Sequence, residues 1–136
     1  NGAVVFYGSQ QSAASVADSA AELVRLKMIE EMLDIYYNRG GFSYTIAYLI
    51  ETVGAGAFRF YEKLADFYYT SGFQHRDRKK DDQYRILLAF ARTLAQERDE
   101  PAIEETALKM LTRDAEASMN PENLKRFLRK GWEITR

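Results

Sequence analysis

The sequence lacks cysteine and has a single histidine among its 136 residues. Without cysteine, this chain cannot form disulfides, zinc–thiolate sites, iron–sulfur ligation or a cysteine nucleophile. One histidine, His75, cannot make a multi-histidine metal site, and we expect a solvated side chain there because its neighbours are densely charged. We therefore predict no catalytic residue, no cofactor-binding residue and no metal ligand in this chain.

An excess of one charge and long apolar runs are also missing. The 19 basic and 20 acidic residues give a net charge of −1, whereas general nucleic-acid binders usually carry a basic excess. No apolar run approaches the ~20 residues that a membrane-spanning helix needs, and the N-terminus does not have the pattern of a secretory signal. We therefore expect neither a nucleic-acid nor a membrane partner, and a cytoplasmic location.

The residues that are present indicate a helical domain. With 46% hydrophobic and 29% charged residues, the composition is that of one globular domain. After residue 20, apolar residues recur every three or four positions, and this spacing directs Leu23 and Leu26 toward the core. We predict an all-α fold, a compact bundle of about five to six helices with an irregular or extended N-terminal tail. Residues 1–20 are assigned to a linker or tail, with a strand candidate at 3–7, and residues 21–136 to the helical domain.

Capping residues predict where the helices begin. Asp18 or Ser19 is expected to cap the first helix, because Ser19 and Glu22 form a capping box. Ser43 is expected to cap the second helix, and Asn120 with the following proline the last one. Glycines are expected to end several of them. The predicted helices cover about residues 18–38, 43–53, 57–71, 81–97, 101–118 and 121–130.

Aromatic residues are concentrated between positions 36 and 73, which hold twelve of the eighteen. Their helical spacing favours a role in the core. Adjacent residues diverge by about 100° around a helix, so both rings of Tyr36-Tyr37, or of Tyr68-Tyr69, cannot point inward. At least one ring of each pair should lie near the surface. We therefore name Tyr36, Tyr37, Tyr68 and Tyr69 as a candidate interaction surface.

The C-terminal segment is basic, with five positive and two negative side chains between positions 122 and 136. Arg126, Arg129 and Lys130 are therefore added to the candidate interaction surface, because they could contact an acidic partner or phosphates. The alternative is a solvated helix face whose cations complement the C-terminal end of the helix dipole.

Two other patterns have the outline of chemical sites. Gly54-Ala55-Gly56 has two glycines of a dinucleotide-binding loop, but it lacks the third glycine and the βαβ context, which favours a break between helices. The pairs Glu30-Glu31 and Glu104-Glu105 consist of adjacent helical residues, so neither pair shares one acid–base site.

Three motifs, in this order and spacing, carry a family resemblance. The first combines Arg25-Leu26-Lys27, Ile29-Glu30, Tyr36-Tyr37-Asn38 and Gly40, and the others cover residues 60–68 and 84–90. They resemble the helical C-terminal domain of bacterial radical S-adenosylmethionine (SAM) proteins that also carry an N-terminal cobalamin-binding domain and are described as Fe–S oxidoreductases. The resemblance covers residues 22–95 well.

The resemblance implies a longer parent enzyme, which agrees with a sequence that begins without methionine. That parent would use a 4Fe–4S cluster and SAM, and cobalamin as a further cofactor. This chain would be its non-catalytic accessory domain, with the catalytic barrel of the same polypeptide as its partner. It would cap or support the barrel, or recognise a substrate or another protein.

Two alternatives remain open. One is an independent helical interaction module without an enzymatic parent. The other is the ligand-binding half of a helical transcription regulator, which predicts an apolar cavity inside the bundle. The reading frame before residue 1 separates these interpretations, because a CxxxCxxC motif supports the enzyme and a helix-turn-helix supports the regulator.

Overall fold

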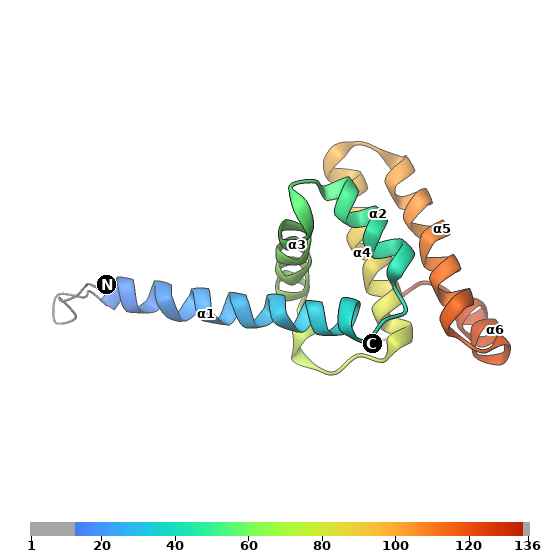
Figure 1. Cartoon of the computed structure of the whole chain (residues 1–136), viewed down its shortest axis with the longest axis horizontal. Helices are drawn as coiled ribbons and strands as arrows, with labels where there is room; N and C mark the ends of the chain where they lie inside the picture. Colours follow the sequence, from blue (N-terminus) through green and yellow to red (C-terminus); the bar gives the residue numbers. More distant parts are fainter. Residues whose placement is uncertain (1–12, 135–136) are drawn as a thin grey trace.

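The computed structural model describes residues 13–134, and within them every regular element is helical (Figure 1). This confirms the predicted all-α class. The tail at residues 1–12 and the strand candidate at 3–7 lie outside the described residues. In chain order the elements are α1 (Ala13–Leu33), the π-helical turn η2 (Asp34–Asn38), α2 (Ser43–Val53), α3 (Gly56–Ser71), the 3-10 turn η3 (Phe73–His75), α4 (Lys80–Arg98), α5 (Pro101–Ser118) and α6 (Pro121–Lys130).

Helix α4 forms the centre of the fold. Its residues 82–88 are all buried, so this stretch is surrounded by other elements on every side. Helix α5 lies alongside α4, and α2 packs on α5. On the α3 side, the ring of Phe90 meets those of Phe60 and Phe67 edge to face, at centroid distances of 5.8 and 5.6 Å. The aromatic residues of α3 therefore belong mainly to the core, as their spacing predicted.

The predicted helix ends are confirmed where glycine or asparagine sets them. Gly72 ends α3 with a positive φ of 76°, which glycine adopts without the steric cost of a Cβ atom. Asn120 caps α6, because its side-chain oxygen accepts a hydrogen bond from the Asn123 amide at 2.8 Å. The segment Gly54-Ala55-Gly56 separates α2 from α3, so it is a helix break.

The two ends of α2 are satisfied by residues of other helices. Ser43 is the first residue of α2 and Phe42 occupies the capping position, so the predicted Ser43 cap is wrong. The amides of Tyr44 and Thr45 are instead bound by the carboxylate of Asp114 on α5. At the other end, the guanidinium of Arg98 donates to the last carbonyl oxygens of α2. An anion at the N-terminus and a cation at the C-terminus complement the helix dipole.

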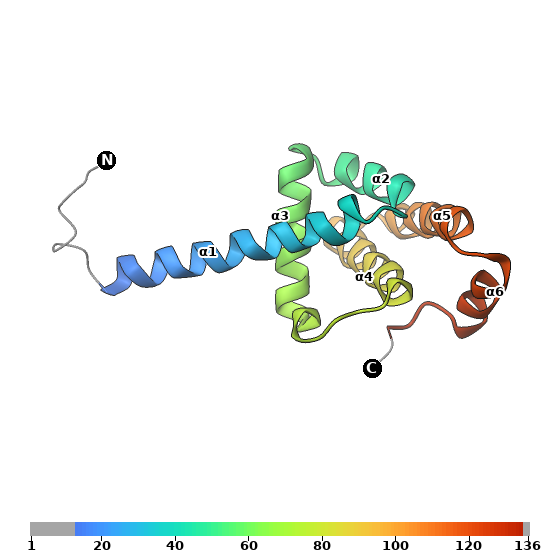
Figure 2. The ribbon, with the colours of Figure 1, turned by 60° about the horizontal axis from the view of Figure 1, so that its bottom comes forward.

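The first helix is longer than the capping box predicted. Asp18 and Ser19 lie inside α1, and the boundary between residues 20 and 21 falls within this helix, so residues 13–20 are not an extended tail. Alanine at five of the positions 13–21 explains the difference, since alanine is the strongest helix former and continues the helix before the cap signal. Figures 1 and 2 show that the N-terminal half of α1 extends away from the other helices.

That extension overturns the predicted packing of α1. Leu23 and Leu26 do not face the core but are exposed, because the side of α1 that meets α3 carries other residues, among them Val24 and Arg25. After α1 crosses α3, its apolar side chains become buried, beginning with Ile29 and Met32. The periodicity of α1 is therefore correct, but only its C-terminal half has a surface to pack against.

Candidate functional site

The structure separates the two tyrosine pairs as their spacing predicts. Tyr37 and Tyr69 are 70% and 61% exposed, whereas Tyr36 and Tyr68 are buried. The expectation of one surface ring in each pair is confirmed. The assignment of Tyr36 and Tyr68 to the interaction surface is wrong, because both rings lie in the core between η2, α3 and α4.

The buried rings form a hydrogen-bonded chain instead. The Tyr36 and Tyr68 hydroxyl oxygens are 2.5 Å apart, and the Tyr36 hydroxyl donates to the carbonyl oxygen of Gln83 at 3.2 Å. The Tyr68 hydroxyl is therefore the donor to Tyr36. Burial raises the pKa of Tyr36 well above its ordinary value and that of Tyr68 to about 12. These two hydrogen bonds connect η2, α3 and α4.

We expect these phenols to make the protein sensitive to alkali. The pKa of Tyr68 rises from 10.0, the ordinary value of a tyrosine side chain, to about 12 in the fold. Its contribution to the free energy of unfolding is therefore complete below pH 10 and is lost as the pH approaches 12. Two pKa units correspond to about 3 kcal/mol of unfolding free energy. Melting temperatures measured across this range should fall more steeply for the unmodified chain than for Tyr68→Phe. Parallel curves would contradict this assignment.

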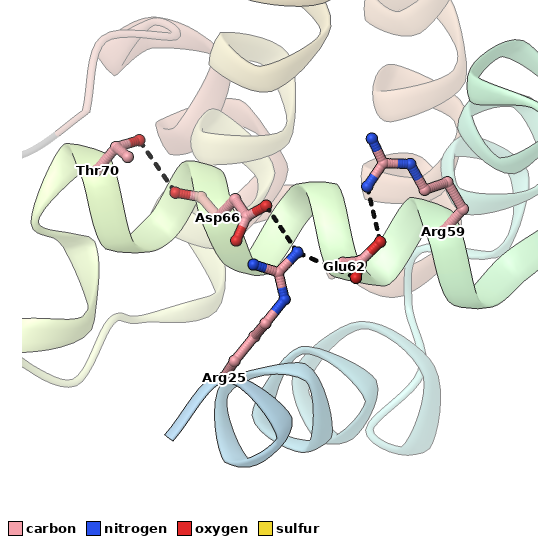
Figure 3. A network of polar contacts seen from close by, with 5 residues as sticks. All are labelled: Arg25, Arg59, Glu62, Asp66 and Thr70. Atoms are coloured by element: carbon pink, nitrogen blue, oxygen red, sulfur yellow. Dashed lines mark hydrogen bonds and ion pairs between the residues drawn. The ribbon is translucent and has the colours of Figure 1, made fainter. Parts of the chain in front are cut away.

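A network of ion pairs fixes α1 where it crosses α3 (Figure 3). Arg25 of α1 reaches Glu62 and Asp66 of α3 at 3.0 and 3.3 Å, and Arg59 binds Glu62 at 2.7 Å. Hydrogen bonds from Arg59, and then from Arg25, lower the pKa of Glu62. The network is solvent-exposed, so its main effect is to set the direction of α1 rather than to stabilise the fold.

Two hollows lie on different sides of this crossing. The hollow between α1 and α3 has a volume of about 610 Å³, and Tyr69 lines it beside Val24, Met28 and the charged side chain of Asp66. Tyr37 lines the other hollow, so the structure does not bring the two exposed tyrosines into one surface. Each tyrosine must be considered with its own neighbours.

The second hollow is a groove of about 500 Å³ between the end of α1, η2, α2 and the start of α3. Aliphatic side chains of Leu33, Ile46 and Ile50 line it together with aromatic rings, and no charged side chain does. Tyr61 also lines the groove, and burial, with a further contribution from the Tyr37 phenol, raises the pKa of Tyr61. The sequence contains no signal for the groove, which depends on how α2 meets α3.

The basic residues of the C-terminal segment form a third, separate region. Helix α6 exposes the side chains of Arg126, Arg129 and Lys130. His75, on η3, is also exposed. Figures 1 and 2 show α6 at the end of the molecule opposite the projecting half of α1. The seven candidate residues therefore divide into two buried tyrosines, two tyrosines in different hollows, and a basic patch on α6.

These features define a small all-helical domain with a projecting first helix and a charge-free groove. The family described as protein of unknown function (DUF4080) matches residues 17–134, and the chain belongs to this family. Neither a curated protein nor a solved structure matches the chain. None of the helices within residues 13–134 has the length and apolar character to cross a membrane. Over the same residues, no three histidine, aspartate or glutamate side chains are grouped so that they could hold a metal ion.

Proposed function

We propose that this chain is the non-catalytic C-terminal domain of a radical SAM, cobalamin-binding Fe–S oxidoreductase, and that it supports the catalytic barrel through the projecting half of α1. The motifs described above over residues 22–95 support the first part of this proposal. They fall inside the stretch of residues 17–134 that matches the family.

The exposed apolar side chains of α1 carry the second part. Leu23 and Val24 are 58% and 54% exposed, and Val16, two helical turns before Leu23, is exposed on the same side. Covering such side chains stabilises by roughly 25 cal/mol per Å² of apolar surface removed from water. These exposed apolar side chains on the projecting half of α1 are the surface that we propose for the contact.

The partner that we propose is the barrel of the same polypeptide. In a C-terminal domain, the barrel precedes α1 and is tethered to the end that projects. A short tether gives an effective concentration on the order of millimolar, so even a small apolar contact is populated. Docking along α1 places helices α2–α6 beside the barrel, where these helices can exclude water from the reaction.

The cofactors of the proposed parent lie outside this chain. A 4Fe–4S cluster of this class needs cysteine ligands, and the sequence has none. The residues present therefore do not fit the cluster, and we assign the cluster, SAM and cobalamin to the preceding domains. The expected cytoplasmic location belongs to this same proposal.

The parent can be tested first by its reading frame. We expect a CxxxCxxC motif and a cobalamin-binding domain upstream of residue 1. An upstream stop codon or an unrelated domain would overturn the enzymatic parent.

The docking surface can be tested by Leu23→Glu, with Leu128→Glu as the matched control on exposed α6. In the parent protein, Leu23→Glu should accelerate tryptic cleavage between barrel and helical domain, because the charge must be buried at the contact. The melting temperature of the present chain should stay the same, since Leu23 makes no core contact. Equal cleavage of both variants would rule out docking through α1.

A further inference from the structure

The hydroxyl group of Tyr61 is exceptional among the buried tyrosines. Its side chain is 3% exposed, and the hydroxyl is buried without a hydrogen-bond partner among the described residues. Tyr36 and Tyr68 bind each other, and Tyr84 donates to the Gly41 carbonyl oxygen at 2.7 Å. Burying an unpaired hydroxyl costs roughly 1–3 kcal/mol, and phenylalanine would fill the same space without that cost. The unpaired group therefore points to a partner that is absent when the chain is alone.

The groove that Tyr61 lines has the properties of a small-molecule site. Its volume of about 500 Å³ falls in the usual range for such sites. The lining is mostly apolar and aromatic, with Phe42 beside the aliphatic residues named above and Ser43 as its one aliphatic hydroxyl. The hollow on the other side of the α1–α3 crossing differs, since Glu22, Arg25 and Asp66 line it.

The π-helical turn places an adaptable side chain at this groove. In η2 the Arg39 amide donates to the Asp34 carbonyl oxygen at 3.1 Å, five residues back, which inserts one residue into the helical turn. Such insertions are rare in helices as a whole, but many of those that occur lie at functional sites. Here the turn buries Tyr36 and leaves Tyr37 exposed at the groove, where its phenol is near enough to Tyr61 to contribute to the raised pKa of Tyr61. Rotation of this exposed ring is the movement that a ligand requires to reach the buried Tyr61 hydroxyl.

We propose that this groove binds a neutral, mostly apolar small molecule whose single oxygen acceptor receives a hydrogen bond from the Tyr61 hydroxyl. A charged ligand is excluded because the lining offers no counter-ion, and burying an unpaired charge is costly. A pure hydrocarbon would leave the hydroxyl unpaired. A ketone or a tertiary amide attached to an aromatic or branched aliphatic body satisfies both conditions. This inference does not depend on the proposed parent enzyme.

Three naphthalene probes of the same ring system test the proposal by nuclear magnetic resonance titration of the full chain. Acetylnaphthalene carries a neutral acceptor, ethylnaphthalene has no acceptor, and naphthoate is charged. We expect saturable binding of acetylnaphthalene with shifts at η2, α2 and the start of α3, weaker binding of ethylnaphthalene, and none of naphthoate. Absence of saturable binding, or preference for naphthoate, would overturn the proposal.

Two variants locate the contact. Tyr61→Phe should weaken binding of acetylnaphthalene by about fivefold and leave ethylnaphthalene unchanged, because only the ketone uses the hydroxyl. Ala47→Trp fills the groove from an exposed position and should abolish binding of both probes, whereas Ala102→Trp on exposed α5 should not. Equal affinities of Tyr61→Phe and the unmodified chain for acetylnaphthalene would refute the hydrogen bond. A lower melting temperature for Tyr61→Phe would do so as well, because it would reveal a partner for the hydroxyl within the fold.

Discussion

Replacing Asp114 with alanine should lower the free energy of unfolding by about 3 kcal/mol. The buried carboxylate accepts hydrogen bonds from the Tyr44 and Thr45 amides at 3.1 and 2.8 Å, and from the Thr45 hydroxyl at 2.7 Å. Alanine leaves these three donors without their acceptor, and two of them are at the N-terminus of α2, where no carbonyl of that helix can replace it. Urea denaturation of the purified chain measures the loss.

Two further variants separate the hydrogen bonds from other effects at this position. Asp114→Asn keeps one acceptor oxygen and similar volume, so we expect about half the loss of the alanine variant. Glu116→Ala removes an exposed carboxylate from the same helix and should change the free energy by less than about 0.5 kcal/mol. If Asp114→Ala were as mild as Glu116→Ala, the capping of α2 by α5 would be wrong.

Arg85→Met is the second substitution with a large expected effect, also about 3 kcal/mol. The Arg85 side chain is buried, and its Nε donates to the carbonyl oxygen of Gly131 at 2.9 Å, while Nη1 binds the Asp82 carboxylate at 3.0 Å. Its guanidinium also lies 4.8 Å from the centre of the Phe127 ring. Methionine keeps the aliphatic volume, so the loss reports the polar and cation–π contacts that tie α6 to α4.

The single tryptophan provides a local measurement for this variant. Trp132 packs edge to face on Phe127 at 4.9 Å, so its fluorescence follows the attachment of the C-terminal segment. In Arg85→Met, the tryptophan transition should come at lower urea concentration than the loss of helix measured by circular dichroism. Arg129→Met, on the exposed face of α6, is the control and should leave both transitions unchanged. Unaltered transitions in Arg85→Met would show that Arg85 does not anchor this segment.

Helix positions could be predicted because they depend on local signals. Apolar periodicity located α2 to α6, and residues such as Gly72 and Asn120 set their ends. The predicted start of α1 was wrong because a capping box at Ser19 competes with the helix propensity of the alanines around it. Local signals also cannot tell whether an apolar face has a neighbour, which is why the prediction that Leu23 lies in the core was wrong.

Most of the candidate site depends on distant contacts, which the sequence does not reveal. The helical period predicts that one ring of each tyrosine pair is exposed, but not that Tyr37 and Tyr69 line different hollows. Asp114 binds residues about 70 positions earlier in the chain. Its one sequence signal is a carboxylate on the same face as buried Leu111 and Ala115. The sequence also cannot predict that the Tyr61 hydroxyl is unpaired, because this depends on how η2, α2 and α3 pack together.

Hydrogen exchange of the α1 amides tests the central claim most directly, by comparing the proposed full-length parent with the present chain. We predict that amides in residues 16–26 exchange at least about tenfold more slowly in the parent, because docking on the barrel adds about 1.4 kcal/mol or more to the cost of local opening. Amides of α4, which is central in both, should exchange alike. Identical exchange of residues 16–26 in the two proteins would contradict the account, because the projecting half of α1 would then have no partner in the barrel.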